Sequence, residues 1–172
     1  MRETLCEIPK KLKKLIKEVE ILLIQPNEKI IFRNCKTAIE YGKSFGKNLD
    51  YSESSIEDVE EILDFYSKDL NPGYVKSFVR KVTGKKVTVN QIQSMATIWG
   101  VYLGEVVRIH SSSNCNWFVE NVFGDGEILH LQIGQTKAFP IDKVIKRLRN
   151  GPEDSIVSFY RVIKHNMGEE IS

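Results

Sequence analysis

The sequence predicts a single α+β domain over residues 1–172, with a helical N-terminal half, a three-stranded antiparallel meander and two C-terminal helices. Three observations lead to this prediction. Apolar residues recur every three or four positions up to residue 109, the period changes to two between residues 115 and 139, and the helical period returns after Pro140. A chain of 172 residues is long enough for one hydrophobic core without disulfide or metal support.

The first predicted helix covers residues 8–24 and is amphipathic and basic, with an end at Pro26. The sequence leaves open whether the segment 1–26 packs against the domain or lies at its periphery. A second helix is predicted from Glu28 to Leu49, with Gly42 and Gly46 weakening its interior.

The third helix is expected after Ser54, which forms a capping-box pattern with Glu57 and precedes an apolar stripe that reaches Leu70. The turn residues that follow predict a break and then a short helix at 74–82. Thr88 and Gln91 form a second capping-box pattern, which predicts the start of a long helix.

This long helix has an unusual second stripe, because Ala96, Gly100 and Gly104 recur every four residues and align on one side. A glycine inside a helix costs about 1 kcal/mol relative to alanine. We therefore expect backbone or a large aromatic side chain to pack against this flank. A ligand slot beside the glycines is the alternative.

The predicted meander begins with a strand at 117–123, followed by a tight turn at 124–126 and a second strand at 129–133. A turn at Gly134 leads into a short third strand that ends at Phe139. A helix over 141–148 follows, and Pro152 is placed to open a last helix. We expect the polar tail, 165–172, to fray.

The composition argues against several classes of function. The 25 basic and 23 acidic residues leave a net charge of only +2, so we expect no nucleic-acid partner. No apolar run approaches the ~18 residues of a membrane span, and no signal peptide is recognised, so we expect a cytoplasmic protein. Cys6, Cys35 and Cys115 are read as reduced thiols, and the isolated histidines predict neither a metal site nor a cofactor.

Two sets of charged residues are the candidate binding sites. An acidic segment contains Glu57, Glu60, Glu61 and Asp64, and could mask a basic surface on a partner. Glu105 follows Gly104, with Arg108 three residues on, and a carboxylate at the edge of an open groove could act as a general base. The structural interpretation of the first set is solvated or paired charges. That of the second is an ordinary ion pair, or a buried acid held by Arg147 or Arg149.

Three stretches and three single aromatic residues carry a recognisable pattern: LDYSESSIEDVEEIL at 49–63, WGVYLGE at 99–105, Trp117, and KVIKRLRNGPEDS at 143–155 with Phe159 and Tyr160. The pattern resembles a group of small, mostly bacterial domains of unknown function and covers about the last two thirds of the chain. The resemblance implies a fold and no catalytic residues. Compact α+β domains of this size also resemble immunity or antitoxin proteins encoded beside secreted toxins.

The motifs of nucleophilic, phosphate-binding and metal-dependent enzymes are absent from the sequence. We therefore expect a non-enzymatic cytosolic domain that binds another protein, of the immunity or antitoxin type. The alternative is a hydrolase or small-ligand-binding protein that uses a groove near Gly100, Gly104 and Glu105.

Overall fold

The computed structural model describes residues 26–70, 88–112, 114–124 and 126–169. It confirms an α+β fold in which helices precede a three-stranded antiparallel sheet and two further helices follow. The helices predicted at 8–24 and 74–82 lie outside the described residues, as do the lysines and arginine between positions 76 and 86.

The first described helix is α2 (Pro26–Ser44), which begins at the proline that was expected to end the preceding helix. Proline suits the first helical position because its missing N–H has no partner there anyway. The helix ends before Leu49, five residues earlier than predicted. Gly46 adopts a left-handed conformation (φ 71°), and the Lys47 N–H bonds the Gly42 carbonyl to close the last turn. Leu49 stays buried by folding back over Gly42.

Helix α3 (Ser55–Leu70) starts where the sequence predicted it. Helix α5 (Val89–His110) begins at the capping box of Thr88 and Gln91, which is confirmed in both directions. The Gln91 N–H donates to Thr88 Oγ1 at 3.2 Å, and the Thr88 N–H donates to Gln91 Oε1 at 2.8 Å.

The sheet contains β1 (Cys115–Glu120), β2 (Ile128–Ile133) and β3 (Thr136–Ala138) in the order β1-β2-β3, with both pairs antiparallel. The turn at Gly134 is as predicted, whereas the first hairpin is looser. Strand β1 ends at Glu120, and both Gly124 and Gly126 have positive φ. Phe123 therefore lies in the connecting loop, where its ring is 5.5 Å from that of Phe139.

Helix α6 (Pro140–Asn150) ends at Gly151, whose φ of 94° and N–H bond to the Arg147 carbonyl make it the predicted stop. Pro152 opens a separate 3-10 turn, η1 (Pro152–Asp154), and α7 (Ile156–Glu169) begins only after it. The backbone of α7 is helical past His165, where fraying was expected.

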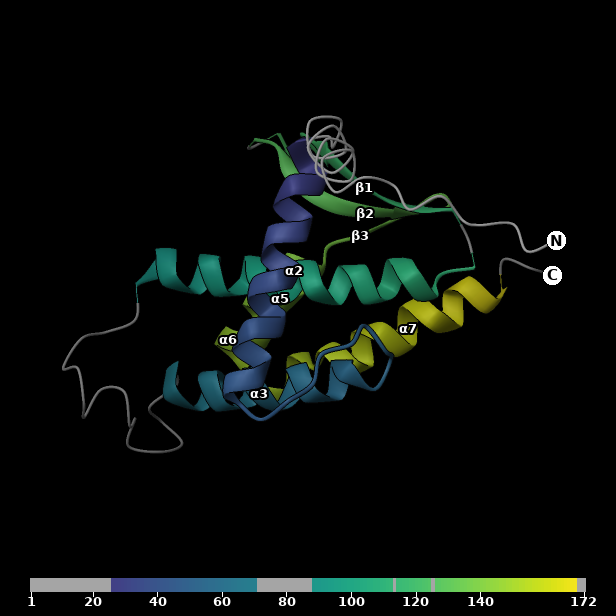
Figure 1. The fold of residues 1–172 in the computed structure, drawn as a ribbon. Helices are drawn as coiled ribbons and strands as arrows, with labels where there is room; N and C mark the ends of the chain where they lie inside the picture. Colours follow the sequence, from purple (N-terminus) through teal and green to yellow (C-terminus); the bar gives the residue numbers. More distant parts are fainter. Residues whose placement is uncertain (1–25, 71–87, 113, 125, 170–172) are drawn as a thin grey trace, which may run out of the picture.

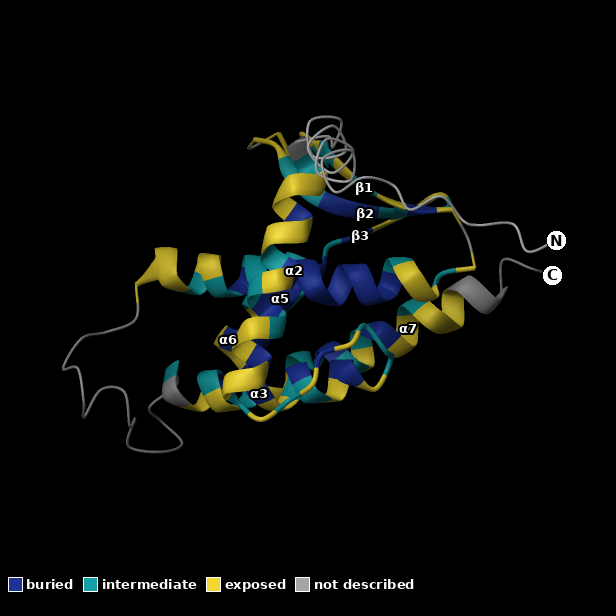
Figure 2. Ribbon diagram, viewed as in Figure 1, coloured by how far each residue is buried: buried dark blue, intermediate teal, exposed yellow. Residues whose placement is uncertain are grey.

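Helix α5 is the centre of the fold (Figure 1). Helix α2 crosses α5, the sheet lies on one side of α5, and α3 and α7 lie on the other, with α6 packed against both α5 and α3. The middle of α5 is buried continuously from Trp99 to Val107, while both of its ends are exposed (Figure 2).

The glycine stripe of α5 is covered by other parts of the chain. A Cβ atom at Gly100 would lie 2.5 Å from the Ile141 Cα atom, which belongs to the start of α6. A Cβ atom at Gly104 would overlap the ring of Trp117 and approach Pro140 Cγ at 3.1 Å. The expected close approach is confirmed, and a ligand slot directly beside these glycines is not present because protein atoms fill it.

None of the helices in the described ranges combines the length and the apolar character that crossing a bilayer requires.

Candidate functional site

A pocket of about 470 Å³ lies where α2 and α5 meet β1. Its volume falls within the range of about 300–1,000 Å³ that is typical of small-molecule sites. Both members of the predicted Glu105 and Arg108 pair line it, but on a different side of α5 from the filled glycine stripe. Its lining residues are Asn27, Glu28, Ile31, Phe32, Cys35, Tyr51, Glu105, Arg108, Asn116 and Trp117.

Glu105 is only 9% exposed, and three hydrogen bonds fix its carboxylate in the pocket wall. Arg108 donates from Nε to Oε1 at 2.8 Å and from Nη2 to Oε2 at 2.9 Å, a bidentate pair across one turn of α5. Trp117 donates from Nε1 to Oε1 at 2.7 Å. Because Gly104 lets the indole lie against α5, the same close approach that fills the stripe brings this N–H to the carboxylate.

Tyr51 forms another part of the wall, and its backbone is held in the left-handed region at φ 64°. For a residue with a large side chain this conformation is strained and persists only where the surroundings impose it. The Tyr51 N–H donates to the Tyr102 hydroxyl at 2.9 Å, and His110 Nε2 lies 2.9 Å from the Tyr51 carbonyl oxygen. The rings of Tyr51 and Tyr102 stack at 5.2 Å.

The thiol and phenol in this pocket are both protonated at neutral pH. Burial, reinforced by the negative charge of Glu105, raises the pKa of Cys35 to about 12. Burial also raises the pKa of Tyr51, with Cys35 adding to the effect. The guanidinium of Arg108 stays charged, since its bond with Glu105 raises its pKa further. The pocket therefore offers hydrogen bonds and one firmly held cation rather than a thiolate nucleophile.

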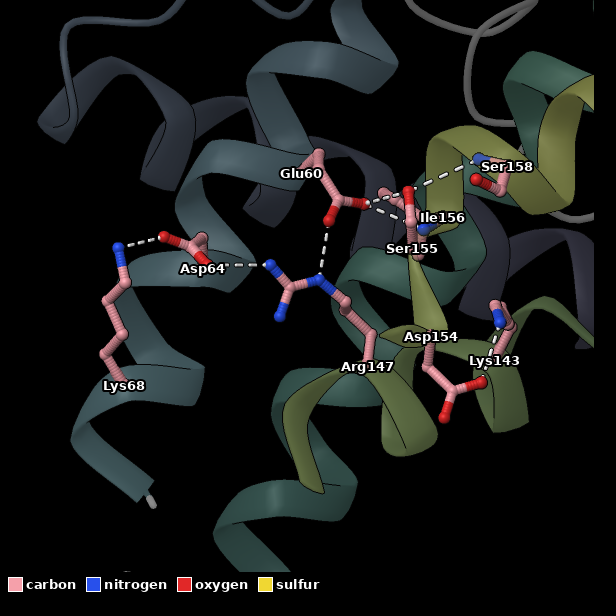
Figure 3. Close-up of polar contacts among 9 residues, drawn as sticks. All are labelled: Glu60, Asp64, Lys68, Lys143, Arg147, Asp154, Ser155, Ile156 and Ser158. Atoms are coloured by element: carbon pink, nitrogen blue, oxygen red, sulfur yellow. Dashed lines mark hydrogen bonds and ion pairs between the residues drawn. The ribbon is translucent and has the colours of Figure 1, made fainter. Parts of the chain in front are cut away.

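Two acidic residues of α3, Glu60 and Asp64, are held by the buried guanidinium of Arg147 (Figure 3). Arg147, only 1% exposed, donates to Glu60 Oε1 at 2.6 Å and to Asp64 Oδ1 at 3.0 Å. The second oxygen of Glu60 accepts the N–H of Ile156 at 2.7 Å. Glu60 and Asp64 thus join α3 to α6 and α7.

The other two candidates on α3 face outward. Glu57 is exposed, and the Glu61 side chain is 68% exposed although it lies 2.5 Å from Lys47 Nζ. A partner docking on this helix would therefore meet Glu57 and Glu61, and the predicted acidic docking surface stays a prediction. In the ranges that the structure describes, no three His, Cys, Asp or Glu side chains are grouped as metal ligands would be.

Sequence reasoning identified Glu105 and Arg108 but missed Tyr51, Cys35 and Trp117 as pocket residues. Their partners lie up to 59 residues away, as in the contact between His110 and Tyr51. The close approach expected at Gly104 predicted a large aromatic neighbour, but it did not identify Trp117 as that residue.

No family model, curated protein or solved structure matches this chain.

The resemblance to a group of small bacterial domains therefore stays a prediction, and the function has to be argued from the site alone.

The raised pKa of Cys35 predicts slow alkylation. In the folded protein at pH 8.5 we expect iodoacetamide to label Cys35 at least ~100-fold more slowly than in urea, because the thiolate is the reacting form. Peptide mass spectrometry would measure the rate for this cysteine by itself. Equal labelling rates with and without urea would contradict the burial of the thiol.

The same raised pKa affects the stability of the fold at high pH. As the pH rises above the ordinary pKa of a thiol, the unfolded chain releases the Cys35 proton before the folded chain does, so the free energy of unfolding falls between about pH 9 and 12.

Proposed function

We propose that the chain is a non-enzymatic binding domain that takes up a small polar ligand in the pocket between α2, α5 and β1. The observation that carries this proposal is the fixed guanidinium of Arg108 in the pocket wall. An arginine has five N–H donors, and two of these are used by Glu105, which leaves three for a ligand. Because Glu105 already sets the orientation of the guanidinium, little side-chain freedom is lost when a ligand binds.

The donors of Arg108 suit a planar anionic group such as a carboxylate, which two parallel N–H groups can bind together. The carboxylate of Glu105 also lines the pocket beside Arg108, so a ligand that carries a hydrogen-bond donor next to its carboxylate matches both the guanidinium and this carboxylate. Phe32, Tyr51 and Trp117 supply aromatic surface for its remaining atoms. Small zwitterions such as α-amino acids have this combination of groups.

Binding is favoured over catalysis by the state of the side chains that could react. Cys35 is protonated, and both oxygens of Glu105 accept hydrogen bonds from Arg108. A general base needs an oxygen that is free to take a proton from a substrate. The hydrolase alternative therefore receives less support than the ligand-binding alternative from the same two residues.

The indole N–H of Trp117 is the reporter for this pocket, because its bond to Glu105 places it in the wall. We expect at least one member of a panel of α-amino acids to shift the NMR signal of this indole N–H, and the spectrum of Trp117→Phe would assign that signal. Arg108→Gln should weaken that binding about tenfold or more, since it removes a charged donor pair.

Arg33→Gln is the matched control, because this substitution removes the same charge. Arg33 is an exposed residue of α2 and does not line the pocket. Its affinity for the panel should equal that of the wild type. If no compound shifts the Trp117 signal, or if Arg108→Gln binds as well as Arg33→Gln, the proposed function is wrong.

A protein partner with a basic surface, such as a toxin, is the second candidate, and the outward position of Glu57 and Glu61 favours it. Reversing both charges to lysine should abolish low-salt capture of the protein encoded by the adjacent gene and leave the fold intact. Glu60→Ala, on the inner side of the same helix, should instead lower the free energy of unfolding by about 3 kcal/mol, because the buried Arg147 loses the carboxylate that accepts from its Nε and keeps only Asp64 among its described carboxylate partners. Capture that is indifferent to the charge reversal would exclude this surface.

A further inference from the structure

A second pocket, of about 410 Å³, lies between the end of the sheet and the last two helices. It shares no lining residue with the pocket around Arg108. Its walls are largely apolar, with the rings of Phe139 and Phe159 and the side chains of Ile133 and Ile163 among them. Phe123, which the loosened first hairpin leaves in a loop, adds a third ring beside Phe139.

Three lysines also line this pocket, and their pairing differs. Lys143 lies 2.8 Å from Asp154 Oδ1, and this contact lowers the pKa of Asp154. Lys137 bonds Glu120 across the sheet. Lys146 is exposed and, in the part of the chain that the structure describes, lies within ion-pair distance of no carboxylate, although its charge also lowers the pKa of Asp154. Asp142, one helical turn before Lys146, lines the pocket as well.

The lining residues include three lysines against two aspartates, Asp142 and Asp154. A largely apolar space with an exposed lysine at its wall is complementary to a molecule that has an apolar body and one anionic group. Moving the apolar part out of water would lower the free energy of binding, and the anionic group would form a hydrogen-bonded ion pair with the ammonium group of Lys146.

We propose that this pocket binds an amphiphilic carboxylate, with its apolar chain against Phe139, Phe159 and Ile163 and its carboxylate at Lys146. The site is independent of the proposed function, since it uses other elements of the fold.

Octanoate and 1-octanol are the probes that separate the two parts of this proposal, because they share a chain and differ in charge. We expect octanoate to shift the methyl NMR signals of Ile133 and Ile163 and to bind more tightly than octanol. Lys146→Gln should weaken octanoate about tenfold and leave octanol within about twofold. Lys43→Gln, which removes the same charge from the exposed end of α2, should change neither affinity.

Three results would overturn the proposal. The first is a complete lack of shifts at Ile133 and Ile163. The second is an equal affinity for octanoate and octanol, which would mean that the pocket takes up apolar chains without recognising an anion. The third is a shift of the Trp117 indole signal in place of the methyl signals, which would place octanoate in the pocket of Arg108.

Discussion

The contact between the ring of Trp117 and the bare backbone at Gly104 is the constraint on which the rest of the structure depends. Any side chain at position 104 would overlap the indole, so the sheet can approach α5 this closely only because glycine is there. A glycine inside a helix is unfavourable by about 1 kcal/mol, and the packing of the half-buried Trp117 ring against it offsets that loss. Gly100 likewise allows the start of α6 to approach α5 closely, because Ile141 lies against the α5 backbone there.

This packing also orders the candidate site. The indole that covers Gly104 donates to Glu105, and Glu105 in turn holds Arg108. Residues of β1 and α5 are thereby joined into one rigid wall before any ligand arrives. On the next face of α5, the Tyr102 hydroxyl bonds the Tyr51 N–H and Ser55, so the turn before α3 is fixed to the same helix.

Local patterns predicted most of the fold. The capping box at Thr88 and the stop at Gly151 depend on residues a few positions apart, so the sequence alone was enough to place them. The errors were also local: the left-handed turn at Gly46 ended α2 early, and Pro26 began a helix that it was expected to precede.

The site was less predictable because its contacts are distant in sequence. Glu105 and Arg108 were recognised since they lie one helical turn apart, whereas Glu60 and Arg147 are 87 residues apart. The acidic residues of α3 looked alike in sequence, and only the fold separates the half-buried Glu60, which is paired with Arg147, from the exposed Glu57. Nothing in the sequence marks Tyr51, since tyrosine gives no sign of a positive φ.

A double-mutant cycle between positions 104 and 117 tests this account most directly. Gly104→Ala should lower the free energy of unfolding by about 1–3 kcal/mol when Trp117 is present, because the added methyl group overpacks the contact. In a Trp117→Leu background most of that loss should disappear, leaving only the approach to Pro140. An equal loss in both backgrounds, measured by urea denaturation, would show that the indole does not lie on Gly104 and would contradict the arrangement of the site.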